Sequence, residues 1–180
     1  FKFNFCITEV SKSNSSCWTK PRQISQDSNR SEQNPLLFLI DQNRVQLIHS
    51  AQKSRDQNDI SWREGDNAFS MQWTAKLISQ DRKIRSSRWS KPSELISSNA
   101  FCRHPPYQRN DGRLLLPIYR SLEQGGSFGH DFSQVLILEA DGTPSNNVVN
   151  IPSSKGRVHG SIVLSADGTK LLQFFRSRLA

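Results

Sequence analysis

Three arginines stand beside predicted strands, where their side chains can bind an anion. Arg103 lies just before Pro105-Pro106, and Arg120 and Arg176 each follow an apolar run that ends in an aromatic residue. The guanidinium group is a rigid fork that binds a carboxylate through two parallel hydrogen bonds. Each of these side chains is therefore a candidate for binding a carboxylate. Surface arginines that cover an apolar rim are the alternative.

Two histidines accompany these arginines. His104 directly follows Arg103, and His159 follows Arg157 at the equivalent position of the next repeated segment. Two imidazoles at equivalent strand entries would converge on one opening, where they can transfer protons. Each histidine can instead be a hydrogen-bonded structural residue, and that alternative stays open.

Loops carry the remaining candidates for proton transfer. Arg55-Asp56 begins a segment with two carboxylates in five residues, Glu123 follows Tyr119 closely, and His130-Asp131 pairs an imidazole with a carboxylate. Functional residues are frequent in loops held by a rigid scaffold. A solvated loop around Asp56 and an aromatic core position for Tyr119 are the commoner roles. His130-Asp131 is either an acid/base pair or a loop anchor.

The composition limits the class of protein. The chain has 180 residues and a formal net charge of +8, but its lysines and arginines are dispersed and form no nucleic-acid-binding motif. No apolar run is long enough for a transmembrane helix. The three cysteines are too few for a disulfide framework and lack metal-ligand spacing. We expect no metal, no cofactor and no nucleic-acid partner.

The elements that position these residues are predicted to be β-strands. Short apolar runs alternate with clusters of Gly, Pro, Asn, Asp and Ser, whereas helical periodicity is nearly absent. This pattern predicts an all-β fold. The expected strands are Lys2–Thr8, Leu36–Ile40, Val45–Ser50, Gln72–Ile78, Leu114–Tyr119, Gln134–Glu139, Val148–Ile151, Ser161–Ser165 and Lys170–Phe175.

Two sequence elements repeat along the chain. Segments that begin at Asn34, His104 and His159 each contain a turn centred on aspartate, followed by a strand. Between them lie Ser11–Trp18 and Ser79–Trp89, each followed by Lys-Pro within a few residues, and a weaker third copy at Glu139–Thr143. These elements resemble degraded Asp-boxes, the Ser-x-Asp-x-Gly-x-Thr-Trp turns of sialidase-like BNR-repeat proteins. The stretches "RHPP", "DGRLLLPIYR" and "VHGSIVLSADGTKLLQFFRSR" are also similar to that family.

The resemblance implies a sialidase-like β-propeller built of four-stranded antiparallel blades. Residues 1–30 would be part of one blade, 31–97 and 98–152 two whole blades, and 153–180 part of another. We therefore expect an incomplete propeller of about three blades, since closed propellers have about four to eight.

The resemblance also implies an activity. A sialidase-like glycoside hydrolase would release a terminal acidic sugar, hold its carboxylate with Arg103, Arg120 and Arg176, and use Tyr119 as nucleophile beside Glu123, with Asp56 as acid/base. Arg55 and His130 would be further substrate contacts. The Arg-Ile-Pro element of the first sialidase blade is missing. A lyase that cleaves uronic-acid glycans with His104, His159 and Tyr119, or a glycan-binding propeller without catalysis, are the alternatives. An acidic glycan is the expected partner, and no protein partner is implied.

Overall fold

The computed structural model describes residues 6–11, 14–25, 27–54, 73–97, 99–121 and 130–178. Every regular element in these residues is a β-strand, so the all-β prediction is confirmed. The sheets are antiparallel, and none of those described closes on itself. Over the same residues there is no helix that could cross a membrane.

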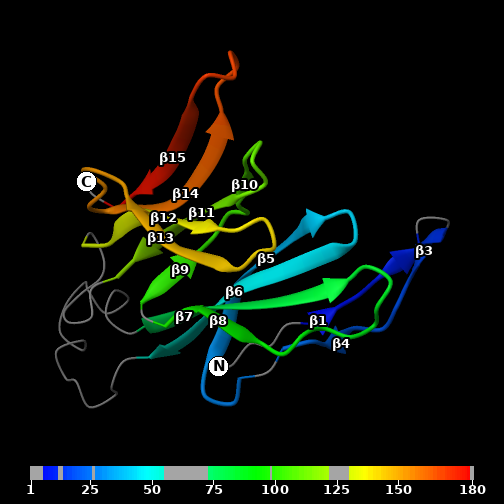
Figure 1. Ribbon diagram of the computed structural model, residues 1–180. Coiled ribbons are helices and arrows are strands. Elements are labelled where there is room, and N and C mark those ends of the chain that lie inside the picture. Colours follow the sequence, from blue (N-terminus) through cyan, green and yellow to red (C-terminus); the bar gives the residue numbers. More distant parts are fainter. Residues whose placement is uncertain are drawn as a thin grey trace.

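The first large sheet is a four-stranded meander (Figure 1). It contains β5 (Ser31–Asp41), β6 (Arg44–Ser54), β7 (Trp73–Lys83) and β8 (Ser93–Ile96) in sequence order. Two short pairs precede it along the chain: β1 (Cys6–Ile7) pairs with β4 (Arg22–Gln23), and β2 (Val10–Ser11) pairs with β3 (Asn14–Trp18).

The second large sheet follows the same scheme. Its first strand is divided into β9 (Ala100–Cys102) and β10 (Tyr107–Gln108), which both pair with β11 (Leu114–Arg120). It continues through β12 (Phe132–Leu138) and β13 (Pro144–Asn150). The antiparallel hairpin of β14 (Arg157–Leu164) and β15 (Leu171–Ser177) packs on β11 and projects beyond the sheets (Figure 1).

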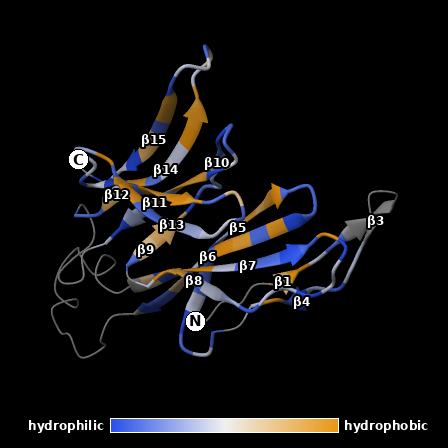
Figure 2. Cartoon of the chain, viewed as in Figure 1, coloured by the Kyte–Doolittle hydropathy of each residue, from blue (hydrophilic) through white to orange (hydrophobic). Residues whose placement is uncertain are grey.

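The core lies between the two large sheets. Successive side chains of a strand point to opposite faces, so alternate residues of β11 form one apolar surface. Leu114, Leu116 and Ile118 supply that surface, and it packs against the first sheet. The buried side chains that complete this cluster are Leu36, Ile48, Leu77, Ala100, Cys102, Leu136 and Leu138. Apolar residues accordingly run along β6 and β11 in Figure 2.

The nine predicted strands correspond to observed ones, although Lys2–Thr8 is described only from Cys6. The prediction of an Asp-box turn at Asp81 is wrong. β7 pairs with β6 along its whole length, so Asp81 lies opposite Gln46 within the sheet and the turn comes later. At the third copy the chain does form an aspartate-centred turn, between β12 and β13.

A bulge interrupts the first strand of each unit. In β5 the register shifts between Gln33 and Leu36, where Asn34 has a φ of 56°. In the second sheet residues 103–106 separate β9 from β10. In β14 the register shifts between Val158 and Ser161, where His159 has a φ of 55°. Bulges redirect side chains and are frequent beside active sites. The three bulges coincide with the starts of the repeated segments.

Aspartate-centred turns join several of these strands. The carboxylates of Asp41, Asp111, Asp141 and Asp167 each accept a hydrogen bond from the backbone N–H two residues later. Hydrogen bonds from Ser165 and Thr169 hold the pKa of Asp167 at about 2. The turn carboxylate therefore remains ionised and keeps its turn hydrogen bonds in mildly acidic solution.

Replacing Gly142 with alanine is expected to destabilise the protein by about 3 kcal/mol, against about 1 kcal/mol for Gly168→Ala. Both glycines have left-handed φ angles, of 85° and 71°. A Cβ at Gly142 would lie 2.7 Å from the amide of buried Gln46, whereas nothing lies within 4 Å at Gly168. Gln46 Nε2 donates to Gly142 O and to Ser79 Oγ, and the added methyl group would displace it. Unfolding by denaturant measures the free energy of unfolding of the two variants. Equal decreases for Gly142→Ala and Gly168→Ala would contradict the prediction.

Candidate functional site

Tyr119 lies at the centre of the candidate site. It is 6% exposed, and its ring stacks on that of Phe101 with centroids 5.0 Å apart. The two residues are direct partners in the pairing of β9 with β11, so they share a face. The ring of His159 from β14 meets the tyrosine ring edge-on, with centroids 5.2 Å apart. A phenol and an imidazole from different sheets are thereby in contact.

An ion pair fixes an arginine over the same ring. Arg178, which follows β15, places its guanidinium carbon 5.7 Å from the Tyr119 ring centroid. Its Nη1 donates to Asp131 Oδ2 at 2.8 Å, and Asp131 is only 1% exposed. Backbone bonds strengthen this connection, because Gly156 N donates to Asp131 O and Arg178 N donates to Gly156 O. The second sheet and the β14–β15 hairpin are joined at this point.

The site is electropositive, and both burial and the nearby positive charges shift the pKa values of His159 and Tyr119. Burial, together with the charges of Arg103, Arg178, Arg176 and His104, lowers the pKa of His159 to about 4. Burial raises the pKa of Tyr119 to about 12, against the charges of Arg178 and Arg103. At neutral pH the imidazole and the phenol are both uncharged, and among the described residues Asp131 supplies a negative charge near the positive ones.

The bulges explain why these residues meet. The chain leaves the sheet after Cys102 and rejoins it at Tyr107, so Arg103 and His104 lie on a bulge beside β11. The expectation that they precede the first strand is therefore wrong, because they interrupt it. His159 likewise lies within β14, where its left-handed φ turns the ring toward Tyr119. A straight strand would point Val158 and His159 to opposite faces.

The structure brings together five of the ten residues that sequence reasoning selected. Arg103, His104, Tyr119, His159 and Arg176 interact through ring contact or charge. Arg120 is adjacent to Tyr119 on β11 and therefore points to the opposite face, toward the first sheet. This geometry removes Arg120 from the expected three-arginine group. His130 is exposed, while its neighbour Asp131 anchors the hairpin. Arg55, Asp56 and Glu123 lie outside the described residues.

Sequence reasoning missed the ion pair of Arg178 and Asp131. The only signal was the Arg-x-Arg spacing in "RSR", in which Arg178 follows Arg176 by two residues. Residues two apart on an extended chain point to the same side. With Arg178 in place of Arg120, the cationic cluster consists of Arg103, Arg176 and Arg178.

The fold and the site together define a class: an all-β protein of repeated antiparallel units with a cationic cluster around a buried tyrosine. Within the described residues no three His, Cys, Asp or Glu side chains gather as metal ligands. Residues 6–180 match the family model described as BNR repeat-like domain, and the chain therefore belongs to that family. A search of curated proteins found no match.

Proposed function

We propose that the protein is a sialidase-like glycoside hydrolase that releases a terminal acidic sugar from glycans. The observation that carries this proposal is the cluster of Arg103, Arg176 and Arg178 around Tyr119 and His159. A sugar carboxylate in this cluster would form charge-assisted hydrogen bonds and neutralise part of the positive field. Membership of the BNR repeat-like family supports the same class of activity.

Binding of the carboxylate would also prepare the proton transfer. The positive charges that lower the pKa of His159 would be partly balanced by the bound anion, so the imidazole would become more basic. Tyr119, whose pKa is about 12, keeps its proton until a base takes it. We propose that His159, whose ring contacts that of Tyr119, takes the phenol proton as the phenol oxygen attacks the anomeric carbon, while the glycosidic bond breaks and the proposed acid Asp56 protonates the leaving oxygen. Asp56 and Glu123 remain proposed carboxylates of this reaction.

A uronate-specific lyase is the second candidate, favoured by the contact between Tyr119 and His159. Elimination next to a carboxylate needs a base that removes the proton at the carbon beside it and an acid that protonates the leaving oxygen. A neutral imidazole and a neutral phenol can supply these two roles, while arginines stabilise the charge that develops on the carboxylate. The same residues therefore support both reactions.

We also propose that the repeated units are blades of a β-propeller, with 31–97 and 98–152 as blades and 1–30 and 153–180 as parts of others. The four-stranded meander β5–β8 and the sheet from β9 to β13 support this arrangement. The bulged first strands would then line the axis, where binding sites of propellers can form.

The decisive experiment compares two substrates with the same protein. Release of the reporter group from a sialyl conjugate would support the hydrolase, whereas an unsaturated uronate, detected by its ultraviolet absorbance, would identify the lyase. Binding of either glycan without turnover would indicate a binding protein. If the protein neither binds nor cleaves any acidic glycan, the proposed function is wrong.

Arg103→Ala is expected to weaken binding of the acidic glycan by roughly tenfold, because a charge-assisted hydrogen bond is lost. Arg103→Lys should restore only part of the affinity, since an ammonium group lacks the planar fork. Arg103 is exposed, so both variants should fold normally. Titration calorimetry measures the affinities. The exposed arginine Arg109, whose ion pair with Asp111 is remote from this face, supplies the control Arg109→Ala. Equal losses in both alanine variants would contradict a specific role.

A further inference from the structure

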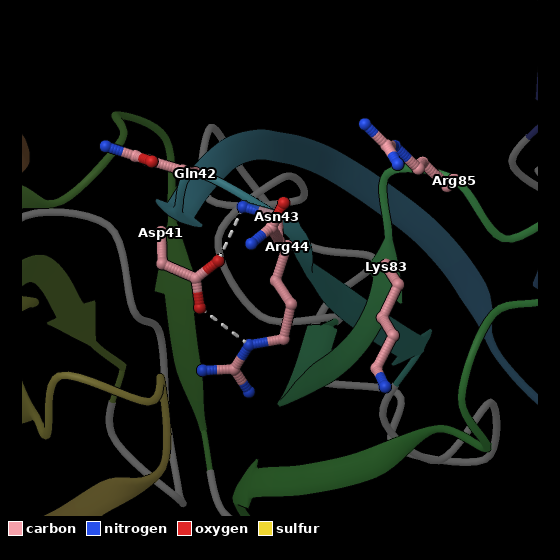
Figure 3. Close-up of a pocket in the computed structure, with 6 residues that line it drawn as sticks. All are labelled: Asp41, Gln42, Asn43, Arg44, Lys83 and Arg85. Atoms are coloured by element: carbon pink, nitrogen blue, oxygen red, sulfur yellow. Dashed lines mark hydrogen bonds and ion pairs between the residues drawn. The ribbon is translucent and has the colours of Figure 1, made fainter.

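A second polar hollow lies at the turn between β5 and β6. It has a volume of about 630 Å³. Its lining residues are Asp41, Gln42, Asn43, Arg44, Lys83 and Arg85 (Figure 3). It is separate from the Tyr119 site. The neighbouring turn at Gly142 contacts Gln46 of β6 and continues from Leu138, whereas Tyr119 pairs with Ser133 at the other end of β12.

The hollow carries an excess of positive charge. Arg44 and Lys83 are direct cross-strand partners of β6 and β7, and their side chains extend to the same side in Figure 3. Like charges placed opposite one another destabilise a sheet. Asp41 offsets one of them, because its Oδ2 accepts a hydrogen bond from Arg44 Nε at 3.0 Å. Across the described residues no ion pair compensates Lys83 or Arg85.

Hydrogen bonds hold the rim of the hollow in place. Asn43 N donates to Asp41 Oδ1 at 2.7 Å, and Ile84 N donates to Asn43 O at 2.7 Å. The second bond ties the β5–β6 turn to the chain that follows β7. Since Asp41 occupies only Nε of Arg44, the two terminal nitrogens remain as donors toward the hollow. A rim that is already ordered reduces the entropy lost on binding.

We propose that this hollow is a second anion-binding site, which takes a sugar unit bearing a sulfate or carboxylate group. Arg44 and Lys83, whose side chains extend to the same side, would bind the oxyanion, and the amide of Asn43 would contact a sugar hydroxyl group (Figure 3). Arg85 extends the other way and would add to the positive field. The volume exceeds that of a bare ion and falls in the range of small-molecule sites. A bound anion would relieve the repulsion between Arg44 and Lys83. This site is independent of any cleavage at Tyr119.

The test titrates the full chain with three probes: a sulfated disaccharide, a uronate disaccharide and an uncharged disaccharide. Nuclear magnetic resonance follows the backbone amide signals of Asn43 and Ile84, which report on the rim of this hollow. We expect saturable shifts of these two signals with one or both anionic probes and none with the uncharged one. The preferred anion distinguishes the sulfate source from the carboxylate source.

Two double variants, each lacking two positive charges, distinguish binding in this hollow from general attraction to a positively charged surface. The double variant Lys83→Ala/Arg85→Ala should weaken the binding seen at Asn43 by roughly tenfold. Arg88→Ala/Lys91→Ala removes the same charge from the loop before β8 and should change it by less than about twofold. Both pairs are exposed, so folding should be preserved. Absence of saturable shifts, or equal losses in the two double variants, would overturn the proposal.

Discussion

Asp131→Ala should reduce the free energy of unfolding by about 3–5 kcal/mol, the largest stability change expected in this protein. Asp131 is 1% exposed and accepts the hydrogen bond from Arg178, which is itself largely buried. The substitution leaves the guanidinium in a poorly solvated place without its anion. Because the pair joins the second sheet to the β14–β15 hairpin, we expect the hairpin to loosen first. Hydrogen exchange of the β14 amides would detect that change.

Two comparisons test the cause of this effect. Asp111 also forms ion pairs with arginines, but at an exposed turn, so Asp111→Ala should cost only about 0–1 kcal/mol. In the double variant Asp131→Ala/Arg178→Met the uncompensated charge is removed, and a large part of the lost stability should return. If Asp131→Ala costs no more than Asp111→Ala, the buried pair does not hold the hairpin.

If the proposed function holds, Tyr119→Phe should lower turnover of the acidic glycan by about 100-fold or more, because the variant lacks the hydroxyl group proposed to transfer a proton or attack the sugar. The ring that stacks on Phe101 and contacts His159 is retained, so the architecture should be unchanged. Affinity for the glycan should change little, since the arginines remain. Steady-state kinetics would therefore show a lower kcat with nearly the same KM, provided that binding is fast.

The other tyrosine of the chain supplies the control. Tyr107 lies in β10 and is only partly buried, so Tyr107→Phe should leave turnover unchanged. A Tyr119→Phe variant with full activity would exclude the phenol from the chemistry and would leave His104 and His159 as candidates among the described residues. A variant that loses activity together with its fold would instead assign Tyr119 to the core, and circular dichroism distinguishes these results.

The order of strands was predictable because short apolar runs and turn residues are local signals. The runs at Leu36–Ile40 and Leu114–Tyr119 are long enough to identify buried strands from composition alone. Short strands such as β9 and β10 were not predicted, because Ala100–Cys102 and Tyr107–Gln108 have too few residues to show a periodic pattern. Their position depends on pairing with β11, which is a tertiary property.

The site was only partly predictable for the same reason. The repeats drew attention to His104 and His159, which lie at interruptions of β9–β10 and of β14, but the ion pair between Asp131 and Arg178 links residues that are 47 apart in sequence. No local pattern indicates such a pair. Arg120 shows a different failure, because the alternation of strand faces already separates it from Tyr119.

The bulges at Asn34, Arg103–Pro106 and His159 carry a consequence for how such a protein can change over time. The first strand is interrupted in all three units, with a left-handed φ at Asn34 and His159, and each interruption presents a different side chain. Each interruption therefore presents a side chain that is not needed for strand pairing. A single substitution there can change the chemistry at that position while the sheets keep their fold. Duplication of one unit would copy the interrupted strand as a whole. Selection could then change the side chain at the interruption without changing the strand.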